Sequence, residues 1–105
     1  MKVMIVGAGK LGYKLASAFS TGDNEVTVVD SDSDVLDRVN EHLDVLVVNA
    51  NGVQIDMLKE LDINTYNLAI AVTESDETNM VICSLAKKLG CDKVIARVRN
   101  PEYAQ

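Results

Sequence analysis

The sequence KVMIVGAGKLG at residues 2–12 decides the fold. Its first part, Lys2–Val6, is short and mostly apolar, as expected for a parallel strand that is buried on both faces. Its second part has the pattern G-x-G-x-x-G and leads directly into Lys10–Ser20, where apolar side chains recur at helical spacing. A strand, a glycine-rich turn and a helix in this order are typical of domains that hold a nucleotide phosphate at the helix N-terminus.

Each glycine of this turn has a separate predicted role. Gly7 allows a tight turn, Gly9 lets a phosphate approach the backbone, and Gly12 lets the helix pack closely on the sheet. The phosphates then meet free N–H groups and the positive end of the helix dipole. Lys10 either contacts a terminal phosphate or is a solvated residue at the helix start. The predicted phosphate-binding residues are Gly7, Ala8, Gly9, Lys10, Leu11 and Gly12.

An acidic residue closes the next predicted strand, Glu25–Val29, and adds a second feature to the site. Asp30 lies 18 residues beyond Gly12. Its carboxylate can accept hydrogen bonds from both hydroxyls of a ribose, and it would repel a phosphate on the 2′ position. The sequence therefore predicts a site for NAD(H), ATP, ADP or AMP rather than NADP(H), with Asp30 and the adjacent Ser31 among its cofactor-binding residues.

The rest of the chain repeats the alternation of strand and helix. Short connections between such elements imply parallel strands joined by right-handed crossovers. We therefore expect an α/β fold, a Rossmann-like doubly wound parallel sheet with strand order 3-2-1-4-5, in a single domain over residues 1–105. The further predicted strands are Val45–Val48, Leu68–Val72 and Lys93–Val98, and the further helices are Asp34–His42, Gln54–Leu61 and one capped by Ser75 and stopped by Gly90.

Polar residues follow two more of the predicted strands at the carboxyl edge of the sheet, where ligands of such folds bind. Asn51 is suited to the edge of an adenine ring, although an ordinary turn explains it equally well. Thr73 and Glu74 are placed to line the far side of a nucleotide. Both positions therefore join the candidate cofactor site.

An arginine in the last predicted strand completes the candidate set. Arg97 is a charge among apolar neighbours, and a buried arginine needs an anionic partner. Either it reaches the phosphates of the ligand, or it pairs with an acid such as Asp76 or Glu77. Beyond it, Asn100 followed by Pro101 predicts the start of a further helix. We expect the natural polypeptide to continue there.

Composition excludes several function classes. The 105 residues are 48% apolar and carry a net charge of −6 without a cluster of Lys and Arg in the sequence, which argues against nucleic acid as a partner. No apolar run approaches the roughly 20 residues of a membrane span, and none suits a signal peptide. Cys83 and Cys91 are expected to be buried reduced thiols, and His42 a surface residue at a helix end. With no catalytic constellation, we expect a cytoplasmic protein that is not an enzyme.

Two longer motifs are more specific than the glycines. They are AVTESDETN at residues 71–79 and IARVRNPEY at residues 95–103. Together with the glycine-rich turn and Asp30, they resemble the TrkA-type regulatory domain of potassium uptake systems, also called the KTN or RCK N-terminal domain. The resemblance covers essentially the whole chain. It departs from the family at residues 50–52, where Ala-Asn-Gly replaces a turn that often begins with glycine.

The resemblance implies a cytoplasmic regulatory subunit that binds NAD(H) or adenine nucleotides. Such subunits assemble as homodimers or higher rings on a membrane potassium transporter or channel, peripheral to the inner face of the cell membrane. By position, residues 7–11 would hold the phosphates, Asp30 the adenosine ribose, Thr73 and Glu74 the region beyond the phosphates, and Arg97 a phosphate or a switching contact. The family's C-terminal ligand-sensing domain is absent from the 105 residues.

Two other interpretations compete with regulation of a transporter. One is the cofactor-binding fragment of an NAD-dependent oxidoreductase, and the other is a stand-alone nucleotide sensor with a different partner. The fourth predicted helix also suggests self-association. Its side chains Met80, Ile82 and Cys83 extend beyond the apolar stripe of Val81, Leu85 and Leu89 that we expect to face the sheet.

Overall fold

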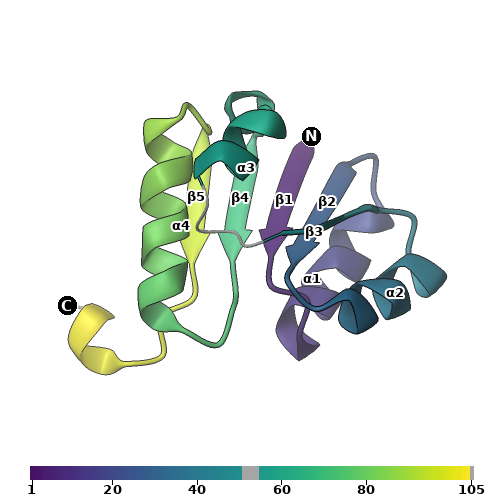
Figure 1. The fold of residues 1–105 in the computed structure, drawn as a ribbon, viewed down its shortest axis with the longest axis horizontal. Helices are drawn as coiled ribbons and strands as arrows, with labels where there is room; N and C mark the ends of the chain where they lie inside the picture. The colour runs from purple at the N-terminus through teal and green to yellow at the C-terminus, as the bar shows by residue number, and fades with distance from the viewer. Residues whose placement is uncertain (51–54, 105) are drawn as a thin grey trace.

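The computed structural model describes residues 1–50 and 55–104, and its five parallel strands lie in the order β3-β2-β1-β4-β5 (Figure 1). This confirms the predicted fold class and strand order. In register, Ile5 of β1 pairs with Val28 of β2 and with Ile70 of β4. The strands are β1 (Lys2–Val6), β2 (Glu25–Asp30), β3 (Leu46–Asn49), β4 (Leu68–Ala71) and β5 (Lys93–Ala96).

The last strand ends earlier than the sequence predicted. β5 stops at Ala96 instead of Val98. The Arg97 N–H still donates to the Ala71 carbonyl at 2.9 Å, but the N–H groups of Arg99 and Asn100 turn to a side chain of the neighbouring helix. Side-chain acceptors have therefore replaced the neighbouring strand as hydrogen-bond partners.

The helices begin close to where the sequence placed them. The third helix is shorter than predicted, and Gln54, its expected first residue, lies outside the described residues. A 3₁₀ turn before β4 was not predicted. The helix start predicted at Pro101 forms as a short 3₁₀ helix. The helices are α1 (Lys10–Ser20), α2 (Ser33–His42), α3 (Ile55–Glu60) and α4 (Asp76–Lys88), with 3₁₀ turns η1 (Ile63–Thr65) and η2 (Pro101–Ala104).

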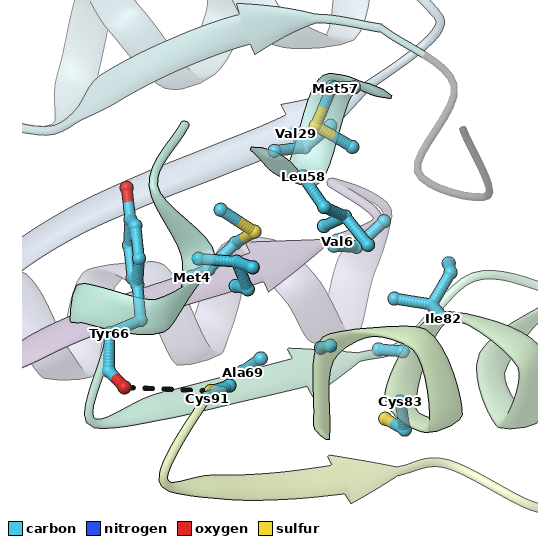
Figure 2. Close-up of a cluster of buried hydrophobic side chains, with 13 residues drawn as sticks. Met4, Val6, Val29, Met57, Leu58, Tyr66, Ala69, Ile82, Cys83 and Cys91 are labelled. Atoms are coloured by element: carbon cyan, nitrogen blue, oxygen red, sulfur yellow. Dashed lines mark hydrogen bonds between the residues drawn. The ribbon is translucent and has the colours of Figure 1, made fainter. Parts of the chain in front are cut away.

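Helices cover both faces of the sheet, α1 and α2 on one and α3 and α4 on the other (Figure 1). Side chains alternate along β1, so Met4 and Val6 point to the α3 and α4 layer. Figure 2 shows them beside Leu58 of α3. Val3 and Ile5 point to the opposite layer. This burial on both faces explains why the strands read as continuous apolar runs.

The sheet-facing side of α4 differs from the prediction. Ile82 is 1% exposed and Cys83 is 6% exposed, whereas Val81 is 47% exposed. The buried stripe runs through Asn79, Ile82, Cys83 and Ala86, which follow the spacing i, i+3, i+4, i+7. Because Asn79 is polar, the sequence did not indicate that this side of the helix is buried. Ile82 and Cys83 therefore belong to the core (Figure 2) and supply no surface for self-association.

The two cysteines are buried and unpaired, as predicted. Burial raises the pKa of both thiols. The Cys91 thiol donates weakly to the Tyr66 carbonyl at 3.6 Å (Figure 2). Among the described residues, no helix combines the length and the apolar character needed to cross a bilayer.

Candidate functional site

The carboxyl ends of the strands open onto a cleft of about 650 Å³. It lies between the turn that joins β1 to α1, the end of β2, and the turn that joins β4 to α4. Most of the candidate residues that the sequence singled out come together here. Those that line the cleft are Gly7, Gly9, Lys10, Leu11, Asp30, Ser31, Thr73, Glu74 and Arg97.

Two candidate residues, Ala8 and Gly12, do not line the cleft. Ala8 is buried beside it, and its N–H donates to Asp30 Oδ2 at 2.7 Å. Gly12 lies beneath the turn, where an added Cβ would approach the Gly7 carbonyl oxygen to 1.8 Å. Asn51 lies outside the described residues. Ala8 and Gly12 therefore shape the turn from behind, and the adenine contact of Asn51 stays a prediction.

The glycine-rich turn contains two different kinds of glycine. Gly7 has φ +106°, and a Cβ there would lie 2.9 Å from the Thr73 nitrogen, so both conformation and packing require glycine. At Gly9, by contrast, an added Cβ would meet nothing within 4 Å. The packing of the domain leaves room for a side chain at Gly9. A small residue there keeps open the space beside the first turn of α1.

The N-terminus of α1 has no internal anion. Gly9 is its N-cap and offers no side chain, and the first turn contains no acidic residue. Positive partial charge therefore faces the cleft without an acid of α1 itself to offset it, because the first N–H groups of a helix lack intrahelical acceptors. A phosphate is the group that suits such a position. The glycine-rich turn thus fits a nucleotide on its own geometry.

Asp30 lies half-buried at the end of β2 and has a structural role that the sequence did not reveal. Its Oδ2 accepts the Ala8 N–H at 2.7 Å, and its Oδ1 accepts the Asp32 N–H at 2.9 Å. The carboxylate therefore joins the glycine-rich turn to the start of α2. Each oxygen of a carboxylate can accept more than one hydrogen bond, so both remain able to accept from a ribose.

Asn79 of α4 fixes the opposite wall of the cleft. It is 0% exposed, and its amide is fully hydrogen-bonded. Oδ1 accepts from the Thr73 N–H at 2.9 Å and from the Thr73 hydroxyl at 2.7 Å, while Nδ2 donates to the Thr73 carbonyl at 3.1 Å and the Arg97 carbonyl at 2.9 Å. Asn79 thus holds the ends of β4 and β5 together. The sequence signal that could have identified Asn79 is a polar residue at the helical spacing of the buried residues of α4.

The predicted pairing of Arg97 with an acid of α4 is wrong. Asp76 instead pairs with Arg99, whose Nε lies 3.7 Å from Oδ1, and Glu77 accepts from the Tyr103 hydroxyl at 2.8 Å. Within the part of the chain that the structure describes, no carboxylate lies within ion-pair distance of Arg97. Its half-buried side chain lines the cleft, and the other alternative, contact with the phosphates of a ligand, stays a prediction.

The cleft also includes residues that sequence reasoning did not select. Ser75 was explained as a helix cap, Thr78 appeared only within the motif at residues 71–79, and the apolar members read as core. Strand and helix periodicity alone does not show which core residues reach a ligand. The additional lining residues are Val6, Val29, Asp32, Val35, Ala50, Val72, Ser75, Thr78 and Ile82.

A second cleft of about 500 Å³ adjoins the first between α1 and α2. Four basic side chains line it, namely Lys10, Lys14, Arg38 and His42. The linear sequence shows no such cluster, because the residues come from two helices. The charged side chains of Lys10, Lys14 and Arg38 add positive potential beside the N-terminus of α1. Among residues 1–50 and 55–104, no group of three or more His, Cys, Asp or Glu is arranged to bind a metal ion.

The strand order, the glycine-rich turn and the acid at the end of β2 define a Rossmann-like α/β domain. The chain belongs to the TrkA-N domain family, which matches residues 3–105.

Several relatives are similar to this chain over nearly the whole of its 105 residues. A Trk system potassium uptake protein TrkA homolog from Archaeoglobus fulgidus is 37% identical over 103 residues. The Trk system potassium uptake protein TrkA of Vibrio alginolyticus is 38% identical over 104 residues. Each match covers 98% of this chain and 23% of the relative. A homolog from Methanothermobacter thermautotrophicus is 32% identical over the full chain, which spans 49% of that protein.

Two solved structures support the fold. The TrkA-N domain of the inner membrane protein ybaL from Escherichia coli has a TM-score of 0.66 at 14% identity, over 98% of this chain and 90% of that one. A 3-hydroxyacyl-CoA dehydrogenase from Archaeoglobus fulgidus has a TM-score of 0.61 at 19% identity, over 93% of this chain and 34% of the enzyme. At these identities the likeness concerns architecture alone.

Proposed function

We propose that this domain binds NAD(H) or an adenine nucleotide, ATP or ADP, in the cleft at the carboxyl edge of its sheet and acts as a regulatory part of potassium uptake. The observation that carries the proposal is the uncapped N-terminus of α1, placed across the glycine-rich turn from Asp30. An anion-binding helix end and a ribose-binding acid are the two features that a nucleotide requires.

Each residue has a part in the proposed site. Gly9, Lys10 and Leu11 would hold the phosphates through backbone N–H groups and the Lys10 charge, and the free guanidinium of Arg97 would reach them from the opposite wall. Asp30 and Ser31 would bind the adenosine ribose. The region beyond the phosphates would be lined by Thr73 and Glu74, and the turn would be shaped by Gly7, Ala8 and Gly12.

The proposed partner is a membrane potassium transporter or channel subunit. The relatives that share this sequence carry the name Trk system potassium uptake protein, and this supports the assignment. The domain would act in the cytoplasm at the inner face of the membrane, reached through its partner. A nucleotide that binds two shapes of the domain unequally shifts the balance between them, and the partner would read that shift.

We also propose assembly as a homodimer or a higher ring. The family resemblance suggests it, and the exposed side chains of Val81 on α4 and Ile95 on β5 leave apolar surface for such a contact. Light scattering at micromolar concentration, with and without NAD and ATP, tests this assembly. A strict monomer in every condition would contradict it for the 105-residue chain.

The cofactor-binding fragment of an oxidoreductase is the less favoured alternative. The dehydrogenase that shares the fold does so at 19% identity, whereas the TrkA relatives reach 37–38% over almost the whole chain. The motifs at residues 71–79 and 95–103 also favour regulation. The domain is therefore proposed to bind the nucleotide without transforming it.

Calorimetric titration of the purified chain with NAD, NADH, ATP, ADP and NADP tests the binding site. We expect at least one of the first four to bind, and NADP to bind about 10-fold more weakly or worse than NAD, because Asp30 repels a 2′-phosphate. Failure of all five to bind would overturn the proposed site.

Potassium flux in vesicles that carry the transporter and the full-length regulator, with and without the bound nucleotide, tests the regulatory role.

A further inference from the structure

The two family-specific motifs, far apart in the sequence, meet in the structure. The chain that leaves β5 passes the N-terminus of α4 (Figure 1). There Asp76, 9% exposed, accepts the Arg99 N–H through Oδ1 at 3.1 Å and the Asn100 N–H through Oδ2 at 2.8 Å. The Arg99 Nε lies 3.7 Å from Oδ1. A single carboxylate thus holds two successive backbone groups of the departing chain.

A second contact extends this connection outward. Glu77 accepts the Tyr103 hydroxyl at 2.8 Å, and the Asn100 side chain accepts the Glu102 N–H at 3.0 Å. The hydrogen bonds from Arg99 and Asn100 lower the pKa of Asp76, and the bond from Tyr103 lowers the pKa of Glu77. We call the contacts of Asp76 and Glu77 with Arg99, Asn100 and Tyr103 the exit clasp.

An acidic first turn alone does not explain Asp76. An acid that only complements the helix dipole needs no burial and no partners. Asp34 in the first turn of α2 shows this simpler case, since it is exposed. Asp76 has instead exchanged solvent for two backbone donors on another segment. Its role is therefore to hold residues 99–100 in place.

The exit clasp is directly connected to the wall of the cleft. Arg99 donates through its guanidinium to the carbonyl of Glu74, which lines the cleft. Asn79, three residues after Asp76, fixes Thr73 and the Arg97 carbonyl, and both of those residues line the cleft as well. The same turn of α4 therefore shapes the cleft on one side and holds the departing chain on the other.

We propose that Asp76 and Asn79 are positioning residues that couple occupancy of the cleft to the order of residues 97–104. This inference rests on the proposed nucleotide site. A ligand that contacts Thr73, Glu74 or Arg97 stabilises the clasped arrangement, and the clasp in turn improves the ligand's affinity, because coupling between two sites is reciprocal. The order of residues 97–104, where the chain leaves the sheet, thereby reports whether a ligand occupies the cleft.

Hydrogen exchange of backbone amides, measured with and without ADP, tests the coupling. In the wild-type chain, ADP should slow exchange at Arg99 and Asn100. Asp76→Asn should speed their exchange without ligand and weaken ADP binding by about 5-fold or more, within the usual range of coupling between sites. Asp34→Asn is the matched control on α2 and should change neither quantity.

The outcomes separate this inference from the proposed function. If wild-type protein binds ADP and Asp76→Asn loosens residues 97–104 but leaves ADP affinity unchanged, the coupling is wrong while the nucleotide site stands. If wild-type protein binds neither ADP nor NAD, the proposed function fails and the coupling fails with it.

Tyr103→Phe is the second variant, used if Asp76→Asn does not fold. Tyr103 is 44% exposed, so this substitution should leave the fold intact. It should reduce the ADP-dependent protection of the backbone amides of Glu102 and Tyr103, and undiminished protection would overturn the coupling.

Discussion

Two helices, α1 and α4, begin at the same edge of the sheet and line the same cleft, yet their N-termini are built in opposite ways. At α4 the Ser75 hydroxyl accepts the Thr78 N–H at 3.2 Å, and Asp76 and Glu77 occupy the first turn. At α1 the cap is Gly9, with no side-chain acceptor and no acid in the first turn. The N-terminus of α4 has a capping side chain and acids in its own first turn, whereas the N-terminus of α1 has neither.

The difference indicates where an external anion belongs. Glycine in place of a capping side chain costs a helix about a few tenths of a kcal/mol, so α1 gives up a little stability at Gly9. Proteins tolerate such local deficits chiefly at functional sites. The anions at α4 have partners in the departing chain, whereas the N–H groups at α1 face a cleft. Substitutions at the N-termini of α1 and α4 therefore distinguish residues that affect nucleotide affinity from residues that affect the stability of the fold.

Gly9→Val should have the largest effect on binding. The branched side chain would occupy the space beside the first turn of α1, which we assign to a phosphate. We expect loss of NAD or ADP affinity by about 100-fold or more, the equivalent of two steps of about 1.4 kcal/mol. Calorimetric titration measures the affinity. Normal binding by a folded Gly9→Val variant would refute the phosphate site.

Gly12→Ala is the matched comparison within the same turn. Its Cβ would lie 1.8 Å from the Gly7 carbonyl oxygen, so the backbone must shift. We expect a loss of roughly 1–3 kcal/mol or more in the free energy of unfolding, as for other overpacked sites. Gly9→Val should lower this free energy by less, about 1 kcal/mol for a poorer N-cap, because its Cβ meets nothing within 4 Å. Urea denaturation of both variants provides the comparison.

Asp30→Ala should have the next largest effect. It removes the proposed ribose acceptor and also the acceptor for the Ala8 N–H. We expect NAD or ADP to bind about 1–3 kcal/mol more weakly, which is about 5- to 150-fold. Asp30→Asn keeps one oxygen acceptor without the charge and should weaken binding less. Equal affinity of wild type and Asp30→Ala would remove this residue from the site.

Ser75→Ala tests the capped N-terminus of α4. Loss of the cap should lower the free energy of unfolding by about 0.5–2 kcal/mol, since the Thr78 N–H loses its acceptor. Nucleotide affinity should change little, because α4 is not expected to bind the phosphates. Thermal denaturation and calorimetry on one sample measure both quantities. A large loss of affinity with unchanged stability would reverse the roles assigned to the two helix ends.

Acidification should have the smallest effect, and we expect it at the start of α4. The pKa values of Asp76 and Glu77 lie below their ordinary values of 3.8 and 4.5. Their contribution to stability is therefore complete above these ordinary values and declines as the pH falls through the lower values of the folded state. A double variant, Asp76→Asn with Glu77→Gln, should lose stability less steeply between pH 5 and pH 3 (roughly the titration range of carboxylates). Equal slopes would count against the exit clasp.

Most of the fold could be predicted from the sequence, because its signals are local. Lys2–Val6 is a buried strand by composition, and the glycines that follow it fix the turn and the helix start. The cap at Ser75 and the stop at Gly90 likewise bound α4 without reference to the rest of the chain. Strand order then follows from the alternation of elements.

The errors came from contacts between distant residues. From the sequence, Asn79 was assigned no separate role, although it lies on the buried stripe of α4 and bonds to Thr73 and Arg97. The sequence offered Arg97 as a partner for Asp76, but the chain turns after Ala96 and presents Arg99 instead. Such pairings depend on where β5 ends in space, and periodicity carries no information about that position.

An amide NMR titration of the 105-residue chain with ADP tests the central claim most directly. The claim is that an external anion binds the open N-terminus of α1 and not the closed N-terminus of α4. We expect the largest chemical-shift changes at the backbone amides of Gly9, Lys10 and Leu11, with smaller changes at Ser75 and Thr78. Changes concentrated at the start of α4 with none at α1, or no saturable change anywhere, would contradict the claim.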